Sequence, residues 1–236
     1  MLKFFGRGSA FSDDHNSAFF TDNNDLVLLD HSLYSFDKLK KLGTPALTGT
    51  GDAAHIYVLI THTHSDHIGG IPLLIHYAFY VWHIPVTVAA PSAETAEHMR
   101  FYLDTLEGCD PKGYDIVTAD KLKWVRDIIP TEHTPSLAGR CFGYLLDVNG
   151  QKTVYTGDTR TLSPFLPYIG SDTELYTEAA SIDSGVHLYI ADNIDRLNEL
   201  SANGTRVYLM HLDNEEAIKA AIEGTELELA PLYEKS

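Results

Sequence analysis

Residues 61–70 read Thr-His-Thr-His-Ser-Asp-His-Ile-Gly-Gly, and this stretch has four metal-ligand side chains within six positions. His62 and His64 stand at i and i+2 and can face one cation, while Asp66 and His67 can turn toward a second. Neutral imidazole and carboxylate are ligands that Zn²⁺ accepts. A histidine-rich loop can also be merely solvated, but the ligand spacing and the Gly-Gly pair that follows favour a metal site.

Short β-rich runs surround this cluster and alternate with helical patterns. The apolar run 57–61 leads into the cluster and the buried pattern 68–81 follows it, so a strand-to-helix loop is expected there. Asn149-Gly150 between two β-rich runs predicts a type I′ hairpin. Strands are expected at 2–5, 17–21, 26–30, 57–61, 86–90, 124–129, 142–148, 152–156, 175–177 and 206–210, and helices at 68–81, 93–106, 190–200 and 215–222.

The pattern His-x-His-x-Asp-His-x-x-Gly-Gly after an apolar strand resembles the signature of the metallo-β-lactamase superfamily. The resemblance implies an α/β fold, an αββα sandwich of two central mixed sheets flanked by helices. It also implies a third histidine, a bridging aspartate and a last histidine, each near a strand end. The sequence offers these residues in order at His133, Asp158 and His211.

The resemblance thus implies two divalent ions and seven ligands. One ion is expected on His62, His64 and His133, and the other on Asp66, His67 and His211, with Asp158 between them. Zn²⁺ is the expected metal and Mn²⁺ the alternative, since histidine and aspartate suit both. Taken singly, the three downstream residues could be ordinary core, loop or turn residues, and their order favours the metal site.

Two adjacent divalent ions favour hydrolysis, because they lower the pKa of a water and neutralise an anionic substrate. We count Asp66, Glu178 and His187 as catalytic candidates. The terminal histidine motif and the aspartate motif resemble the tRNase Z-like phosphodiesterase branch, which has a His-Glu-Ala-Thr element. Here the corresponding residues 177–180 keep Glu178 but have Thr177 in place of the histidine, which puts the usual proton-handling pair in doubt. His187 is a candidate leaving-group acid or phosphate contact, or an ordinary helix-start histidine, and Glu178 could instead orient His211.

Substrate contacts are less sharply indicated by the sequence. Thr134 and Ser136 could donate hydrogen bonds to a phosphate, or could equally satisfy a turn. Tyr34, Phe36 and Tyr168 are candidates to stack on a base, although an aromatic residue in a strand-rich protein is more often part of the core. No role is assigned to the remaining histidines, which lack ligand spacing: His15, His31, His55, His76, His83 and His98.

The charge favours a small substrate. The chain has 17 Lys and Arg against 33 Asp and Glu, a formal net charge of −16, which repels long nucleic acids. The tRNA-processing members have a basic arm, and no insertion with clustered Lys and Arg is evident here. We therefore expect hydrolysis of a phosphodiester in a small nucleotide, and the arm-less form resembles the phage-borne anti-Pycsar family, which implies a 3′,5′-cyclic nucleotide. A tRNase Z-like RNA endonuclease and a non-catalytic nucleotide-binding sponge remain the alternatives.

Length, cysteine content and hydrophobic patterns indicate the number of domains and the cellular compartment. With 236 residues, 44% of them hydrophobic, one domain over residues 1–236 is expected. Cys109 and Cys141 form no Cys-x-x-Cys pair, and no signal peptide or membrane span is evident, so the cytoplasm is expected, the host cytoplasm if a phage encodes the chain. The resemblance also implies a homodimer.

Overall fold

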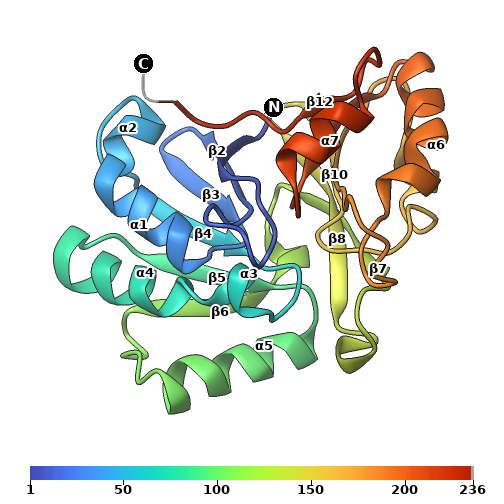
Figure 1. Cartoon of the computed structure of the whole chain (residues 1–236). Helices are drawn as coiled ribbons and strands as arrows, with labels where there is room; N and C mark the ends of the chain where they lie inside the picture. The colour runs from blue at the N-terminus through green and yellow to red at the C-terminus, as the bar shows by residue number, and fades with distance from the viewer. Residues whose placement is uncertain (235–236) are drawn as a thin grey trace.

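Alternation along the strands decides how the layers form. In β3 (Asp25–Leu29), Leu26 and Leu28 belong to one core cluster while Val27 and Leu29 belong to another. Because successive side chains of a strand point to opposite faces, a strand that is apolar on both needs a layer on each side. The computed structural model describes residues 1–234 and supplies those layers as two sheets with helices outside them (Figure 1).

Each half of the chain builds one six-stranded sheet, and the strands lie in sequence order. Both sheets are mixed, with two antiparallel pairings at the first strands and parallel pairings after them. The first sheet contains β1 (Lys3–Gly6), β2 (Ser17–Asp22), β3, β4 (His55–Leu59), β5 (Val86–Ala90) and β6 (Tyr114–Thr118). The second contains β7 (Val125–Thr131), β8 (Cys141–Val148), β9 (Gln151–Tyr155), β10 (Glu174–Glu178), β11 (Arg206–Met210) and β12 (Glu228–Leu229).

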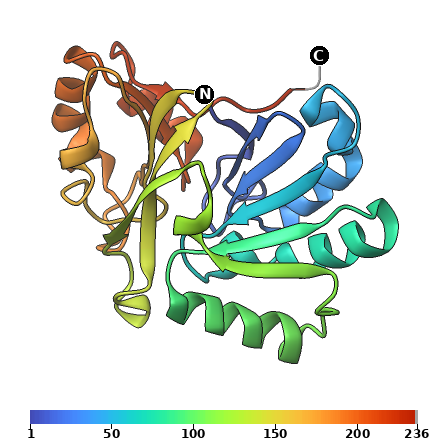
Figure 2. The same cartoon turned by 180° about the vertical axis from the view of Figure 1, so that it is seen from behind.

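Helices cover the outer face of each sheet, and Figure 2 shows the two halves from behind. One group of helices packs on the first sheet: α1 (Leu33–Leu42), α2 (Thr44–Thr48), α3 (Ser65–Ile68), α4 (Ile71–Tyr77) with its π-helical end (Ala78–Trp82), and α5 (Ala93–Arg100) with its π-helical end (Phe101–Leu106). On the second sheet lie α6 (Ile190–Ala202) and α7 (Glu215–Ala221), and short 3₁₀ turns occupy Ala119–Lys121, Pro135–Leu137 and Leu166–Tyr168.

The expected αββα sandwich is confirmed, with a central core cluster that both sheets share. The hairpin at Asn149 and Gly150 is confirmed too, since both residues have positive φ, as a type I′ turn requires. That residues 1–236 form one domain stays a prediction, and residues 235–236 lie outside the described part.

One predicted helix was wrong at its start. The pattern 68–81 indicated a continuous helix, but α4 begins only at Ile71. Gly69 and Gly70 form a separate bend, and a Cβ on Gly70 would lie 2.1 Å from the Ser32 carbonyl oxygen. The chain therefore needs glycine at this close approach, which brings α3 and its ligand-type residues against the end of β3.

Three helices, α1, α2 and α3, and two strands, β6 and β12, were missed by the sequence patterns. Helix α1 has Leu33, Phe36 and Leu39 at helical spacing after the N-cap Ser32, so its signal was present. Strand β12 has two residues, α3 four and α2 five, which is too short for a clear pattern, whereas β6 is as long as its predicted neighbours β4 and β5. Among the described residues, no helix has the length and apolar character needed to cross a membrane.

Candidate metal centre

The predicted ligands come together where strands of both sheets end. Strand β4 of the first sheet ends at Leu59, shortly before the histidine cluster. In the second sheet β7, β9 and β11 end at Thr131, Tyr155 and Met210, and the next few residues supply His133, Asp158 and His211. Neighbouring strands that run in one direction deliver their carboxyl ends to one edge, so residues far apart in sequence meet there.

Three histidines and Asp158 form the first group. Nε2 of His62 lies 2.9 Å from Nδ1 of His64 and 3.8 Å from Oδ2 of Asp158. Nε2 of His133 lies 3.7 Å from the same carboxylate oxygen. His62 and His133 are buried and His64 is half-buried. These four residues could hold one metal ion.

Asp66, His67 and His211 form the second group, also on the buried side. Oδ2 of Asp66 lies 3.1 Å from Nε2 of His67 and 3.3 Å from Nε2 of His211. Asp158 approaches this group as well, at 3.4 Å from each of the two histidine nitrogens. Asp158 thus stands between the two groups, in the place of a bridging carboxylate.

These separations fit metal ligation. Ligand atoms about 2.0–2.1 Å from a tetrahedral Zn²⁺ are about 3.3 Å apart, and the distances above scatter around that value. Two of the ligand-type atoms, Nε2 of His67 and Oδ1 of Asp158, are buried and have no hydrogen-bond partner among residues 1–234. Buried polar atoms are seldom left unpaired, and these two atoms fit a cluster that is capable of binding a cation.

Contacts behind the ligands fix which ring nitrogen faces the cluster. Nδ1 of His67 donates to Oδ2 of Asp30 at 2.9 Å, and Nδ1 of His133 donates to the Val186 carbonyl oxygen at 2.8 Å. Thr61 Oγ1 lies 3.0 Å from Nδ1 of His62. Such partners set the tautomer and orientation of a ligating histidine.

Sequence reasoning missed Asp30 and Val186 in these roles. A signal for Asp30 existed, because an acid directly after the buried run 26–29 is unusual unless it has partners. The Val186 carbonyl carries no side-chain signal at all, and only the fold places it beside His133.

The electrostatics of the cluster also call for a cation. Burial lowers the pKa of His62 well below its ordinary value, which leaves its ring neutral. Burial would also lower the pKa of His211, but Asp158 and neighbouring carboxylates outweigh it and raise that pKa to about 10. For Asp158, burial disfavours the charged form, yet His211 and His67 hold the pKa well below its usual range. Protonated histidines thus neutralise the negative charge of the buried carboxylates here. Bound divalent ions can neutralise the same charge instead.

A carboxylate–histidine pair lies at the edge of the cluster. Oε2 of Glu178, which is buried at the end of β10, lies 2.6 Å from Nδ1 of His187. The His187 ring is partly exposed, and burial, which lowers its pKa, is outweighed by Glu178, so the pKa is raised. Glu178 is also 3.7 Å from Nδ1 of His211, so one carboxylate faces both histidines.

The residues predicted to contact the phosphate or the base have different surroundings in the structure. Thr134 Oγ1 and Ser136 Oγ lie 3.2 Å apart in the turn after His133, so they satisfy each other, and a phosphate contact by either stays a prediction. Phe36 was wrong as a base platform, because it lies on the buried face of α1 and packs on Tyr77. The hydroxyl of Tyr168 donates to Asp127 at 2.7 Å.

The sandwich and the His/Asp cluster at its strand ends define a metal-dependent hydrolase. Residues 26–223 match the family model described as Beta-lactamase superfamily domain. The chain therefore belongs to the beta-lactamase superfamily. Family and site together confirm the predicted enzyme class at the level of a metal-dependent hydrolase, and the cluster is capable of binding metal.

Similar proteins agree with this placement. The chain is 27% identical over 235 residues to the anti-Pycsar protein Apyc1 of Bacillus phage 010DV004, covering 89% of this chain and 88% of that protein. The metallo-beta-lactamase fold protein YhfI from Bacillus subtilis superposes with a TM-score of 0.73 at 15% identity, covering 100% of this chain and 96% of YhfI. The short form of human tRNase Z gives a TM-score of 0.62 at 18% identity, covering 99% and 97%. These two structures share the fold.

Proposed function

We propose that this chain hydrolyses a 3′,5′-cyclic nucleotide with two divalent metal ions, and that a phage could use it against cyclic-nucleotide immune signalling. The pair of Glu178 and His187 beside the metal cluster is the observation that carries the proposal, since it adds a proton donor to a metal centre. The similarity to an anti-Pycsar protein supports the cyclic nucleotide as substrate.

The seven ligands proposed are those of the two groups. Bound there, two divalent ions lower the pKa of a water and neutralise charge on the substrate phosphate. We propose Zn²⁺ in both places, with Mn²⁺ as the alternative. The ligands proposed are His62, His64, Asp66, His67, His133, Asp158 and His211.

His187 has the position of the leaving-group acid. Its Nδ1 is held by Glu178, so Nε2 is the ring atom left to donate a proton. Opening a cyclic ester at O3′ needs such a proton, because an alkoxide is a poor leaving group. Asp66, the third catalytic candidate, touches His67 and His211 and so acts through the metal centre.

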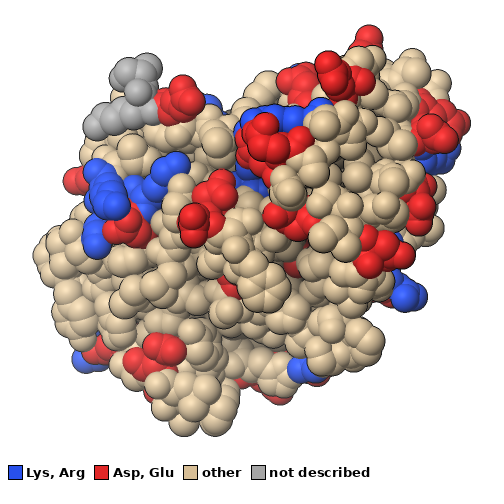
Figure 3. Space-filling view, in the orientation of Figure 1, with Lys and Arg blue, Asp and Glu red and all other residues tan. Residues whose placement is uncertain are grey.

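Charge supports a small substrate rather than a long nucleic acid. The formal net charge is −16, and Figure 3 shows Asp and Glu scattered over the visible face while Lys and Arg form one group near α1 and another near α7. A polyanion is repelled by such a surface. One cyclic phosphate at the metal ions is affected much less, because direct contact with the cations outweighs screened charges farther away.

Two alternatives make distinct predictions. An RNA endonuclease would cleave precursor tRNA with a strong salt dependence, and the fold shared with tRNase Z allows this reading. A nucleotide-binding sponge would bind without turnover, but the Glu178–His187 pair supplies the acid that a sponge would not need.

A substrate panel tests the proposal. Protein loaded with Zn²⁺ or Mn²⁺ is incubated with 3′,5′-cyclic nucleotides, bis(4-nitrophenyl) phosphate and precursor tRNA. Hydrolysis of cyclic nucleotides is expected, cleavage of tRNA alone would overturn the substrate, and binding without product would favour the sponge.

Two ligand variants test the metal centre itself. His64→Ala and Asp158→Ala should each lower turnover by at least about a hundredfold while circular dichroism stays unchanged. His98→Ala is the matched control, because this histidine is exposed on α5. Full activity in both ligand variants would end the two-metal proposal.

Assembly and location complete the proposal. We propose a homodimer, supported by exposed apolar side chains at the ends of α4 and α5, among them Tyr80, Val81, Phe101 and Leu106. Light scattering after size exclusion tests it, and a monomer at assay concentrations would contradict it. We also propose action in the cytoplasm, the host cytoplasm if a phage encodes the chain.

A further inference from the structure

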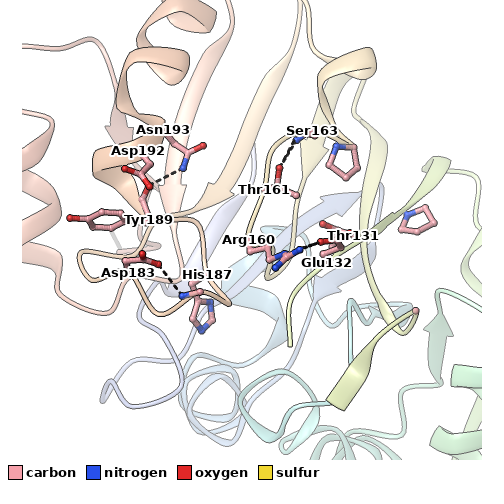
Figure 4. A pocket seen from close by; sticks show the side chains of 14 residues that line it. Thr131, Glu132, Arg160, Thr161, Ser163, Asp183, His187, Tyr189, Asp192 and Asn193 are labelled. Carbon is pink, nitrogen blue, oxygen red and sulfur yellow. Dashed lines mark hydrogen bonds and ion pairs between the residues drawn. The ribbon is translucent and has the colours of Figure 1, made fainter. Parts of the chain in front are cut away.

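A recess of about 820 Å³ opens beside the metal centre and shares His187 with it. Its size is that of a small-molecule site. Figure 4 shows the recess between two walls. One wall contains Asp183, His187, Asp192 and Asn193, from the loop after β10 and the start of α6, and the other contains Glu132 and Arg160.

The proposed reaction places a nucleoside in this recess. A phosphate held at the metal centre would lie next to His187, the donor proposed for O3′, because the His187 ring adjoins the ligand groups of His133, Asp158 and His211. The sugar and base must extend from that point, and His187 is itself part of the lining of the recess. The inference below therefore rests on the proposed function.

Charge on the walls disfavours a second phosphate. Glu132 and Arg160 pair across one wall, with Arg160 Nε donating to Oε2 of Glu132 at 2.8 Å. Asp183 and Asp192 remain on the opposite wall, while the two cationic side chains of the lining are already paired, Arg160 with Glu132 and His187 with Glu178. A neutral nucleoside fits such walls better than a second phosphodiester unit.

Hydrogen-bond acceptors dominate the start of α6. Asn193 Nδ2 donates to the Tyr189 carbonyl oxygen at 2.9 Å, which holds the amide and leaves Oδ1 as a free acceptor. Asp192 forms no hydrogen bond or ion pair within the described part of the chain, so its carboxylate is available too. The two residues are adjacent and both line the recess.

We propose that this recess is the nucleoside subsite and that Asp192 and Asn193 select bases with an exocyclic amino group. Carboxylate and amide oxygens accept from the amino groups of cytosine and adenine. Uracil and hypoxanthine present a carbonyl oxygen at the corresponding position, which would face the same acceptors without a hydrogen.

Matched substrates isolate this contact. Cyclic CMP and cyclic UMP differ at the amino or carbonyl group of position 4, and cyclic AMP and cyclic IMP differ likewise at position 6. The ratio of kcat/KM within each pair should favour the amino base by about tenfold in the wild type. A ratio near one in both pairs would overturn the proposed selectivity.

Two variants test whether Asp192 and Asn193 cause the preference in kcat/KM for bases with an amino group. Asp192→Asn and Asn193→Ala should each reduce the ratio several-fold, and the ratio is insensitive to a folding defect that lowers both rates. Asp195→Asn is the matched control, with the same charge change on α6 outside the recess, and should keep the wild-type ratio. Unchanged ratios in both test variants would overturn the assignment while leaving cyclic-nucleotide hydrolysis standing. Hydrolysis of bis(4-nitrophenyl) phosphate but of no cyclic nucleotide would overturn both the proposed substrate and this subsite.

Discussion

Replacing Asp30 with asparagine tests how the fold prepares the metal centre. Asp30 is fully buried, and its carboxylate accepts hydrogen bonds from three donor atoms. Thr61 N donates at 2.8 Å, Thr61 Oγ1 at 3.0 Å and His67 Nδ1 at 2.9 Å. An asparagine at this position has only one oxygen, so its NH₂ group must face either the Thr61 amide or the His67 ring.

Either orientation of the amide weakens the site. If the NH₂ group faces His67, the ring must move its proton to Nε2 and loses the lone pair that a metal ion would use. If it faces Thr61, two donors meet in a buried place, at a cost of about 1–3 kcal/mol. We expect metal affinity to fall about 10–100-fold, which is about 1.4–2.8 kcal/mol, as for other residues that support a ligand.

Competition with a chromophoric chelator measures this loss. Zn²⁺ affinity is compared between the wild type, Asp30→Asn and Asp25→Asn, a matched change at the other end of β3. The control should bind as the wild type does. Affinity of Asp30→Asn within twofold of the wild type would refute the idea that Asp30 prepares His67.

Two further variants test His187 as the leaving-group acid and Glu215 as a residue that stabilises the fold above low pH. His187→Ala should slow cyclic-nucleotide hydrolysis about 10²–10⁴-fold but bis(4-nitrophenyl) phosphate far less, because a nitrophenolate leaves without a proton; equal losses would argue against the acid role. Glu215 accepts two hydrogen bonds from Arg7, which lower its pKa to about 2. Its ionised form therefore stabilises the fold by about 1–2 kcal/mol above its unfolded pKa near 4.5, and this is lost as the pH falls toward 2. Denaturant unfolding of metal-free protein measures the free energy of unfolding of the wild type and of Glu215→Gln. The variant should be less stable at neutral pH, and this difference should shrink as the pH falls below 4.5. A difference that does not change with pH would contradict the assignment.

Local patterns were enough to predict part of the site. Four ligand-type residues fall within the loop 62–67, so no long-range information was needed to recognise them. His133, Asp158 and His211 were selected by their order within a family pattern, and the fold brings them to the same edge. What they contact behind the cluster could not be predicted, because Asp30 and His67 are 37 positions apart and Val186 acts through its backbone.

In the fold, too, local patterns predicted some features, while contacts between distant segments determined others. The β-rich runs 26–30 and 206–210 predicted the strands that became β3 and β11, and the αββα arrangement followed from the family pattern. The break at Gly70 could not be inferred from periodicity, since it arises from a close approach to the Ser32 backbone in a distant segment. Hydrophobic spacing describes which face of an element is buried, but it carries no information about such backbone contacts.

The departure at Thr177 is explained by strand geometry. Successive side chains of a strand point to opposite faces, so a histidine at position 177 would point away from the face on which Glu178 lies. Leu175 packs toward the outer helices and Tyr176 toward the other sheet, which shows this alternation along β10. The partner of Glu178 must therefore come from another element, and His187 provides it from the loop that follows. The loss of a histidine at position 177 thus leaves the carboxylate–histidine pair intact.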